Sequence, residues 1–240
     1  MRKGLAFALA FALLLPLCGC GAAASQPAVE TEAPVAETEA PAPTAEPETE
    51  AAEETPLPEE QAASTGSHVL VVYFSRTGEN YTVGTIDKGN TAIVAEMIAS
   101  EAGADLFEIV PVTPYPDSYD ECLEVATEEQ RNHARPEYVS EVENWESYDT
   151  VFFGYPIWWG DLPMIAYTFL EGHDWNGKTV IPFNTHEGSG QGGTQRTVEE
   201  LCTGAEIIDG LAVRGGTAQN DREASEIAVR DWLGDMVFFG

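Results

Sequence analysis

Basic residues are scarce in this chain of 240 residues. Lys and Arg number 11 against 41 Asp and Glu, which gives a formal net charge of −30 at pH 7. A surface of that sign repels the phosphate backbone of DNA and RNA, so nucleic acid is excluded as a partner. Solubility is the simplest explanation of the acidity, and a basic partner protein is the alternative.

Cysteine is also rare, and common catalytic and metal-binding motifs are absent. The chain has 4 cysteines and contains no C-x-x-C, no H-E-x-x-H and no G-x-S-x-G, which argues against a zinc site, a metalloprotease and an α/β-hydrolase. Cys122 and Cys202 stand in the apolar helical contexts ECLEVA and EELCTG. We therefore expect two buried free thiols, and a disulfide between them is the alternative in an exported domain.

Large apolar side chains are almost missing from residues 21–66. This segment consists mainly of Ala, Glu, Pro, Thr and Ser, and it contains eleven Glu but neither Lys nor Arg. Such a composition cannot bury enough apolar surface to offset the entropy of ordering. We therefore predict a disordered acidic tether.

The first 20 residues combine Arg2 and Lys3 with an apolar run from Leu5 to Leu17, followed by Cys-Gly-Cys. The run is shorter than the about 20 apolar residues that a membrane-spanning helix needs, and the arrangement is that of a secretory signal. Its end resembles a bacterial lipobox, which implies a lipoprotein signal peptide with Cys20 as the lipidated residue; an ordinary signal peptide is the alternative. We expect an exported lipoprotein, anchored to the membrane through this N-terminus, at the bacterial cell surface or the periplasmic face.

Residues 67–240 alternate between strand and helix patterns, as one α/β domain does. Continuous apolar runs predict buried strands at 69–74, 105–110, 150–154, 178–184 and 206–213, the last with a possible bulge at Gly210. Apolar stripes with start and stop residues predict helices at 91–102, 117–132, 163–170, 194–202 and 221–233. The pattern indicates a doubly wound, five-stranded parallel sheet in a three-layer α/β/α arrangement.

The loops after the first, third and fourth predicted strands are the richest in Gly, Ser, Thr and Trp. In a parallel sheet all three open at the carboxyl edge, where ligands bind. Free N–H groups and the dipole at a helix start favour a phosphate. Because the Gly-Lys-Ser/Thr ending of a Walker loop is absent, the pattern indicates a phosphate monoester held by neutral groups. The candidate groups are Ser75, Arg76, Thr77, Gly78, Asn90 and Thr91.

The other two loops suit a flat ring system. The sequence YPIWWG places Trp158 and Trp159 on a short loop, where an indole either packs into the domain or stacks on a ligand. The sequence THEGSGQGG lets backbone approach a ring closely. Its glycines match G-x-G-x-x-G, but a dinucleotide fingerprint belongs to the first strand-to-helix turn, so NAD(P) binding here is the less favoured alternative. His186 could hydrogen-bond or protonate a reduced cofactor, or only orient its loop.

The domain resembles the flavodoxin family over about residues 68–233. The resemblance rests on VVYFSRTG with GNT, on FEIVPVTPYP, on YDTVFFGYPIWWGDLPM and on IPFNTHEGSGQGG. It implies FMN as cofactor, with the phosphate at the first loop and the isoalloxazine ring between the other two. The cofactor-binding residues that it implies are Ser75, Arg76, Thr77, Gly78, Asn90, Thr91, Pro156, Ile157, Trp158, Trp159, Gly160, Thr185, His186, Gly188, Ser189 and Gly190.

The chain departs from the family at residues 79–89, which separate Thr77-Gly78 from Asn90-Thr91. A helix beginning at Tyr81 would contain Gly84 and Gly89, each of which costs about 1 kcal/mol in a helix. We therefore predict an insertion that forms a small excursion beside the loop and leaves the phosphate-binding groups at its base.

The resemblance implies an FMN-binding electron-transfer protein or oxidoreductase, and the predicted lipoprotein signal places it on the outer side of the cytoplasmic membrane. Its flavin would pass electrons to a quinone or to a protein acceptor, and an NAD(P)H:quinone-type oxidoreductase is one form of this activity. The alternative is a binding or sensory lipoprotein that uses the same fold without redox chemistry. No catalytic side chain and no metal ligand is predicted.

Overall fold

The computed structural model describes residues 68–236 of the chain. The predicted signal peptide at 1–20, with its lipidated Cys20, and the predicted tether at 21–66 lie outside the described residues. Within the described part, no helix has the length and apolar character that crossing a bilayer requires.

The central sheet is parallel throughout. It contains β1 (Val69–Tyr73), β4 (Asp105–Glu108), β5 (Thr150–Pro156), β6 (Thr179–His186), β7 (Glu206–Ile207) and β8 (Leu211–Arg214). The strands lie in the order β4-β1-β5-β6-β7, and β8 also pairs with β6. Since β7 and β8 together form the fifth strand, the order along the chain is 2-1-3-4-5, that of a doubly wound sheet. The predicted fold class is confirmed.

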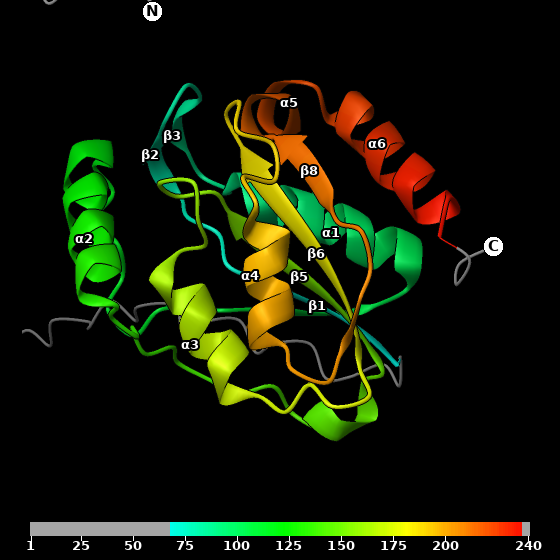
Figure 1. Ribbon diagram of the computed structural model, residues 1–240. Coiled ribbons are helices and arrows are strands. Elements are labelled where there is room, and N and C mark those ends of the chain that lie inside the picture. Colours follow the sequence, from blue (N-terminus) through cyan, green and yellow to red (C-terminus); the bar gives the residue numbers. More distant parts are fainter. Residues whose placement is uncertain (1–67, 237–240) are drawn as a thin grey trace, which may run out of the picture. The chain divides into compact units, whose positions relative to one another are not determined.

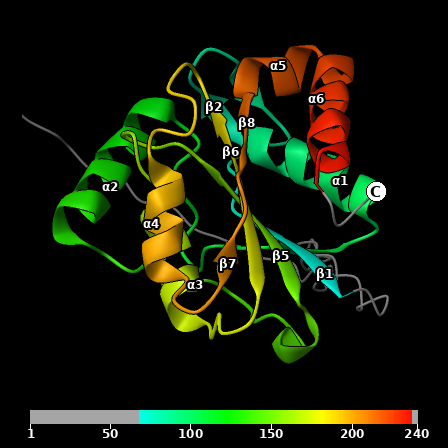
Figure 2. The ribbon, with the colours of Figure 1, turned by 45° about the vertical axis from the view of Figure 1, so that its right-hand side comes forward.

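Helices cover both faces of the sheet (Figures 1 and 2). One layer contains α1 (Asn90–Ala102), α5 (Gly215–Asn220) and α6 (Arg222–Gly234), and the other contains α3 (Met164–Gly172) and α4 (Thr194–Leu201). In both views α2 (Tyr119–Asn132) lies at the left of the domain, set apart from the sheet. A 3-10 turn spans Trp145–Ser147. The sequence did not predict α5.

Two apolar clusters, one on each face of the sheet, form the core. Leu70 and Val72 of β1 pack with Phe169 of α3, whereas Val71, between them, packs with Ile93 of α1. This alternation is what a strand buried on both faces requires, because successive side chains point to opposite sides.

The fifth strand differs from the prediction by its interruption. β6 pairs with β7 up to Val180 and with β8 from Phe183 onward, so two residues of β6 lie opposite residues 208–210. Pro182 lies in this gap and has no N–H to donate to the ladder. A side chain at Gly210 would collide with the Pro182 backbone. Three residues, 208–210, thus face two residues of β6, which is a β-bulge, as Gly210 suggested. The bulge divides the predicted strand 206–213 into β7 and β8.

Residues between β1 and α1 form a two-stranded antiparallel hairpin, which we call the hairpin. Its strands are β2 (Gly78–Asn80) and β3 (Gly84–Ile86). Gly84 has φ +73, a left-handed conformation that favours glycine at the turn. Figure 1 shows the hairpin at the same end of the sheet as the loop that follows β6.

The hairpin is fastened to the start of α2. The Arg76 guanidinium donates hydrogen bonds to the carbonyl oxygens of Glu79 (2.6 Å), Pro116 (2.6 and 3.1 Å), Asp117 (2.8 Å) and Ser118 (3.2 Å). In the other direction, the Glu79 carboxylate accepts a hydrogen bond from the first N–H of α2 at 3.1 Å. A carboxylate at that position also suits the helix dipole.

Both described cysteines are buried and unpaired, which confirms the expected free thiols. Burial raises the pKa of the Cys122 thiol and raises that of Cys202 to about 12. Both side chains are therefore protonated near neutral pH and are poor nucleophiles.

Candidate functional site

The first loop closes beneath the hairpin. Gly89 precedes α1 and has no side chain to cap the helix; instead, Ser75 Oγ accepts a hydrogen bond from the Ala92 N–H at 3.1 Å. A Cβ at Gly89 would collide with Ser75 Oγ and lie 2.6 Å from the Arg76 carbonyl oxygen. Glycine thus allows contact between the segments that enter and leave the hairpin. Ser75 and the first turn of α1 are therefore adjacent despite the intervening residues.

Two buried threonines join the first loop to the end of β6. Thr91 Oγ1 and Thr185 Oγ1 are 2.8 Å apart, and the two residues are 1% and 3% exposed. The Thr91 hydroxyl is therefore engaged within the protein, and what remains at this helix start for an anion is backbone N–H groups.

A cavity of about 200 Å³ opens at the carboxyl edge of the sheet, between the hairpin, α2 and the loops after β5 and β6. The predicted cofactor-binding residues that line it are Arg76, Asn90, Pro156, Ile157, Trp158, Trp159, Thr185 and His186. The structure thus brings residues of all three predicted loops to one place.

Asn90 combines a place in the cavity lining with an unsatisfied polar atom. Its Oδ1 is buried and has no hydrogen-bond partner, while the residue lines the cavity. The amide is held from behind by α5, where a side chain at Gly215 would collide with Asn90 Nδ2. Leaving a buried acceptor unpaired costs about 1–3 kcal/mol. A ligand hydroxyl that donates here removes that cost, so this acceptor fits the hydroxyl-bearing ribityl part of the ligand that the sequence predicted.

His186 is an uncharged donor at the cavity. The Gly188 N–H donates to His186 Nδ1 at 2.9 Å, so Nδ1 carries no proton and the neutral ring has its proton on Nε2. Burial lowers the pKa of His186, which keeps the imidazole neutral near pH 7.

Glu187 contributes a carboxylate to the same lining. Its oxygens accept hydrogen bonds from the Gly216 N–H at 2.6 Å and from Arg214 Nε at 3.2 Å. These bonds tie the loop after β6 to the first turn of α5. Because one of these partners is the Arg214 guanidinium, the negative charge of Glu187 is offset by an ion pair.

The two indoles of residues 156–161, the tryptophan loop, have different roles. Trp158 packs edge-on against Phe74 and Tyr115, with ring centroids 5.5 and 5.0 Å away. Trp159 is 58% exposed and has φ +54. Of the two predicted outcomes for this pair, core packing applies to Trp158, and Trp159 is free to stack on a ligand.

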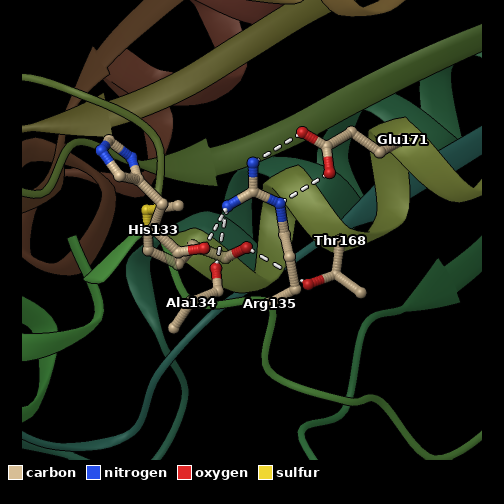
Figure 3. Close-up of polar contacts among 6 residues, drawn as sticks. His133, Ala134, Arg135, Thr168 and Glu171 are labelled. Carbon is tan, nitrogen blue, oxygen red and sulfur yellow. Dashed lines mark hydrogen bonds and ion pairs between the residues drawn. The ribbon is translucent and has the colours of Figure 1, made fainter. Parts of the chain in front are cut away.

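A chain of side-chain contacts holds the tryptophan loop. The Tyr167 hydroxyl donates to the Asp161 carboxylate at 2.9 Å, and the Arg135 guanidinium lies 5.0 Å from the Tyr167 ring centroid. Figure 3 shows the last of these contacts, in which Arg135 pairs with both oxygens of Glu171 at 2.6 Å. The position of Trp159 is therefore supported from α3.

The remaining predicted site residues lie elsewhere. Thr77 is exposed and, with Gly78, lines a separate groove on the other side of the hairpin. Gly160, Gly188 and Ser189 are exposed and are not among the residues that line the cavity, and neither is Gly190.

Sequence reasoning missed one side of the cavity. It is lined by the hairpin and by α2, through Asn80, Tyr81, Tyr119, Cys122, Leu123 and Ala126. Glu187, in the loop after β6, was also missed. The four residues that α2 contributes are spaced as one face of a helix, so the sequence could have predicted that they share an apolar face. Nothing in the sequence indicated that this apolar face lies at the site, because α2 is placed by the Arg76 bonds to a loop about 40 residues away. Among the described residues, no group of three or more His, Cys, Asp or Glu could hold a metal ion.

Comparisons with known proteins agree with the geometry. The family model described as Flavodoxin matches residues 68–232. A candidate flavoprotein from Bacteroides eggerthii DSM 20697 is 34% identical with a TM-score of 0.56, and the match covers 69% of this chain and 95% of that one. A second from Bacteroides uniformis ATCC 8492 is 28% identical with a TM-score of 0.54 over 68% and 97%.

A flavoprotein from Lactobacillus acidophilus NCFM, solved in complex with FMN, is 23% identical with a TM-score of 0.48 over 65% and 97%. A search of curated proteins found no match. The matched family model spans most of the chain, from the residue before β1 into α6, so the chain belongs to the flavodoxin family.

Proposed function

We propose that this protein binds FMN in the cavity at the carboxyl edge of the sheet and acts as an electron-transfer protein or oxidoreductase. Its acceptor would be a quinone or a protein, and its place would be the outer side of the cytoplasmic membrane, on a lipidated N-terminus. The observation that carries the cofactor assignment is the buried, unpartnered Asn90 Oδ1 beside a helix start and an exposed indole. Membership of the flavodoxin family supports it.

The chain's own groups would bind and orient the cofactor. Backbone N–H groups at the start of α1 favour the phosphate, and Ser75 holds that turn against the first loop. Trp159 offers a flat apolar face to the ring. FMN when bound supplies the electron chemistry, and the protein supplies binding, orientation and electrostatics.

The protein's electrostatics would act on the cofactor's reduction potential. The neutral His186 brings no positive charge to the cavity, and the Glu187 carboxylate is paired with Arg214, so the net charge of the whole domain matters most. The domain holds 30 of the 41 acidic residues and 9 of the 11 basic ones. Negative charge gained by a cofactor on reduction is disfavoured in such surroundings, which lowers its reduction potential and suits donation of electrons.

A redox cycle tests this proposal. Purified protein is mixed with FMN, freed of excess cofactor, reduced anaerobically with dithionite and then mixed with a quinone. The expected result is retained flavin absorbance at roughly 450 nm that bleaches on reduction and returns with the acceptor. Retained flavin that no quinone or protein acceptor reoxidises would instead favour the non-redox binding protein, and absence of retained flavin would contradict the proposal.

A further inference from the structure

The cavity has a second side that the cofactor assignment does not use. Tyr81 of the hairpin stacks on Tyr119 of α2, with ring centroids 5.9 Å apart and an interplanar angle of 25°. With Leu123, these two rings line the same cavity as the tryptophan loop. We call Tyr81, Tyr119 and Leu123 the aromatic wall.

One ring of the aromatic wall is exposed, whereas Tyr119 and Leu123 are half-buried. Tyr81 is 60% exposed and Trp159 is 58% exposed, and both border the same cavity. A cavity of about 200 Å³ is at the small end for even one ligand, since ligand pockets run to roughly 300–1,000 Å³. A second ring compound that approaches a bound cofactor must therefore meet the outer rim, where these two aromatic side chains are exposed.

The charges at this rim are negative. The groove that shares Trp159 and Leu123 with the rim is also lined by Asp120, Glu124 and Glu128, against the single cation of Arg131. Within the cavity, Glu187 is paired with Arg214 and Arg76 keeps its positive charge, so the repulsion of anions comes from the rim carboxylates and the net acidic domain. An anion at the rim therefore meets net repulsion, whereas an uncharged ring meets only the aromatic faces.

We propose that the aromatic wall selects the electron acceptor of this protein: it admits uncharged planar quinones, which stack on Tyr81, and the surrounding carboxylates exclude anionic ring compounds and dinucleotides. This inference rests on the proposed function. In the step concerned, the quinone gains two electrons and two protons to become the hydroquinone, and the reduced cofactor gives up the same two electrons and two protons.

The kinetic test compares two quinones that differ in charge. Full-length protein loaded with FMN is reduced with dithionite, and its reoxidation is followed with 1,4-naphthoquinone and with 1,4-naphthoquinone-2-sulfonate. Free reduced FMN with the same two quinones supplies the ratio that their different potentials alone produce. We expect the protein to favour the uncharged quinone by roughly tenfold more than free FMN does at low salt, and we expect that preference to shrink as salt screens the carboxylates.

Variants separate stacking from charge. Tyr81→Ala should slow reoxidation by the uncharged quinone about three- to tenfold, and Tyr81→Phe, which keeps the ring, should restore it. Glu124→Gln should speed the reaction with the sulfonate only. Val112→Ala, which alters an exposed apolar side chain elsewhere on the domain, should change neither rate.

A second readout does not depend on the cofactor. In the protein without FMN, the uncharged quinone should shift the NMR signals of the Tyr81 ring and the sulfonate should not, and Tyr81→Ala should weaken quinone binding about three- to tenfold. A protein that binds and cycles FMN but shows the same quinone ratio as free FMN, or the same rates after Tyr81→Ala, would overturn the role of the wall alone. Failure to retain FMN would overturn the proposed function, and this inference with it.

Discussion

Asn90 is the residue of the cavity lining whose buried side-chain oxygen lacks a hydrogen-bond partner. Its side chain is fixed between the start of α1 and α5, yet its Oδ1 has no partner. Asn184 in β6 also has a buried, unpartnered Oδ1, but it is not among the residues that line the cavity. The two asparagines therefore differ in access to a ligand and not in the state of their side-chain oxygen.

Replacing Asn90 by Ala should weaken FMN binding by about tenfold, because one hydrogen bond to a buried group contributes roughly 1–3 kcal/mol. The protein without FMN should become more stable, by up to about 1–3 kcal/mol, because the substitution removes a buried acceptor that has no partner. Titration followed by flavin fluorescence measures the affinity. Asn184→Ala is the matched control, and it should leave the affinity unchanged. Equal losses in both variants would remove Asn90 from the binding site.

At this scale the sequence predicted residue types better than residue roles. Asn90 and His186 were candidates from their loops alone, and both line the cavity. Thr77 belonged to the same pattern but lies on the other side of the hairpin. The sequence could not reveal that Thr91 uses its hydroxyl on Thr185, because that contact joins residues 94 positions apart.

Among the elements, the hairpin and α2 are the ones that distinguish this site. Neither packs on the sheet as α1 does, and their mutual attachment depends on Arg76 and Glu79. The strands of the sheet were predictable because a continuous apolar run indicates a strand buried on both faces, and this signal is local in the sequence. In contrast, α5 begins with two glycines and is supported by Glu187, which accepts the Gly216 N–H, so its sequence carries little helix signal.

Replacing Arg76 by Lys should detach the hairpin from α2. A lysine ammonium cannot reproduce the planar set of donors that reaches four carbonyl oxygens, and we expect a loss of about 2–3 kcal/mol in the free energy of unfolding. Limited proteolysis should cut the variant within residues 78–86 faster than the wild type. Arg222→Lys, at an exposed position on α6, is the control. Wild-type stability and an uncut hairpin in the Arg76 variant would refute this attachment.

For the whole molecule, charge is the dominant property. The chain carries a formal net charge of −30, and the described ion pairs are few and mostly exposed, so they contribute little stability. Self-repulsion of a net acidic domain opposes folding. The same field repels anions from the cavity rim, which links overall composition to the choice of acceptor.

Salt should therefore stabilise the protein. Between roughly 10 mM and about 150 mM NaCl the Debye length falls from about 30 Å to about 8 Å, and we expect the free energy of unfolding to rise by on the order of 1 kcal/mol. Urea denaturation at the two salt concentrations measures the change. Sodium sulfate at equal ionic strength should give a similar increase if screening is the cause; stabilisation by sulfate alone would point to solvent exclusion instead.

Calorimetric titration of the purified protein with FMN and with riboflavin, which lacks the phosphate, tests the central claim most directly. The account predicts one FMN bound per chain with a dissociation constant below roughly 1 μM, and riboflavin bound at least about a hundredfold more weakly. No heat of binding with FMN, or equal affinities for the two flavins, would contradict a cavity that holds the phosphate at the start of α1.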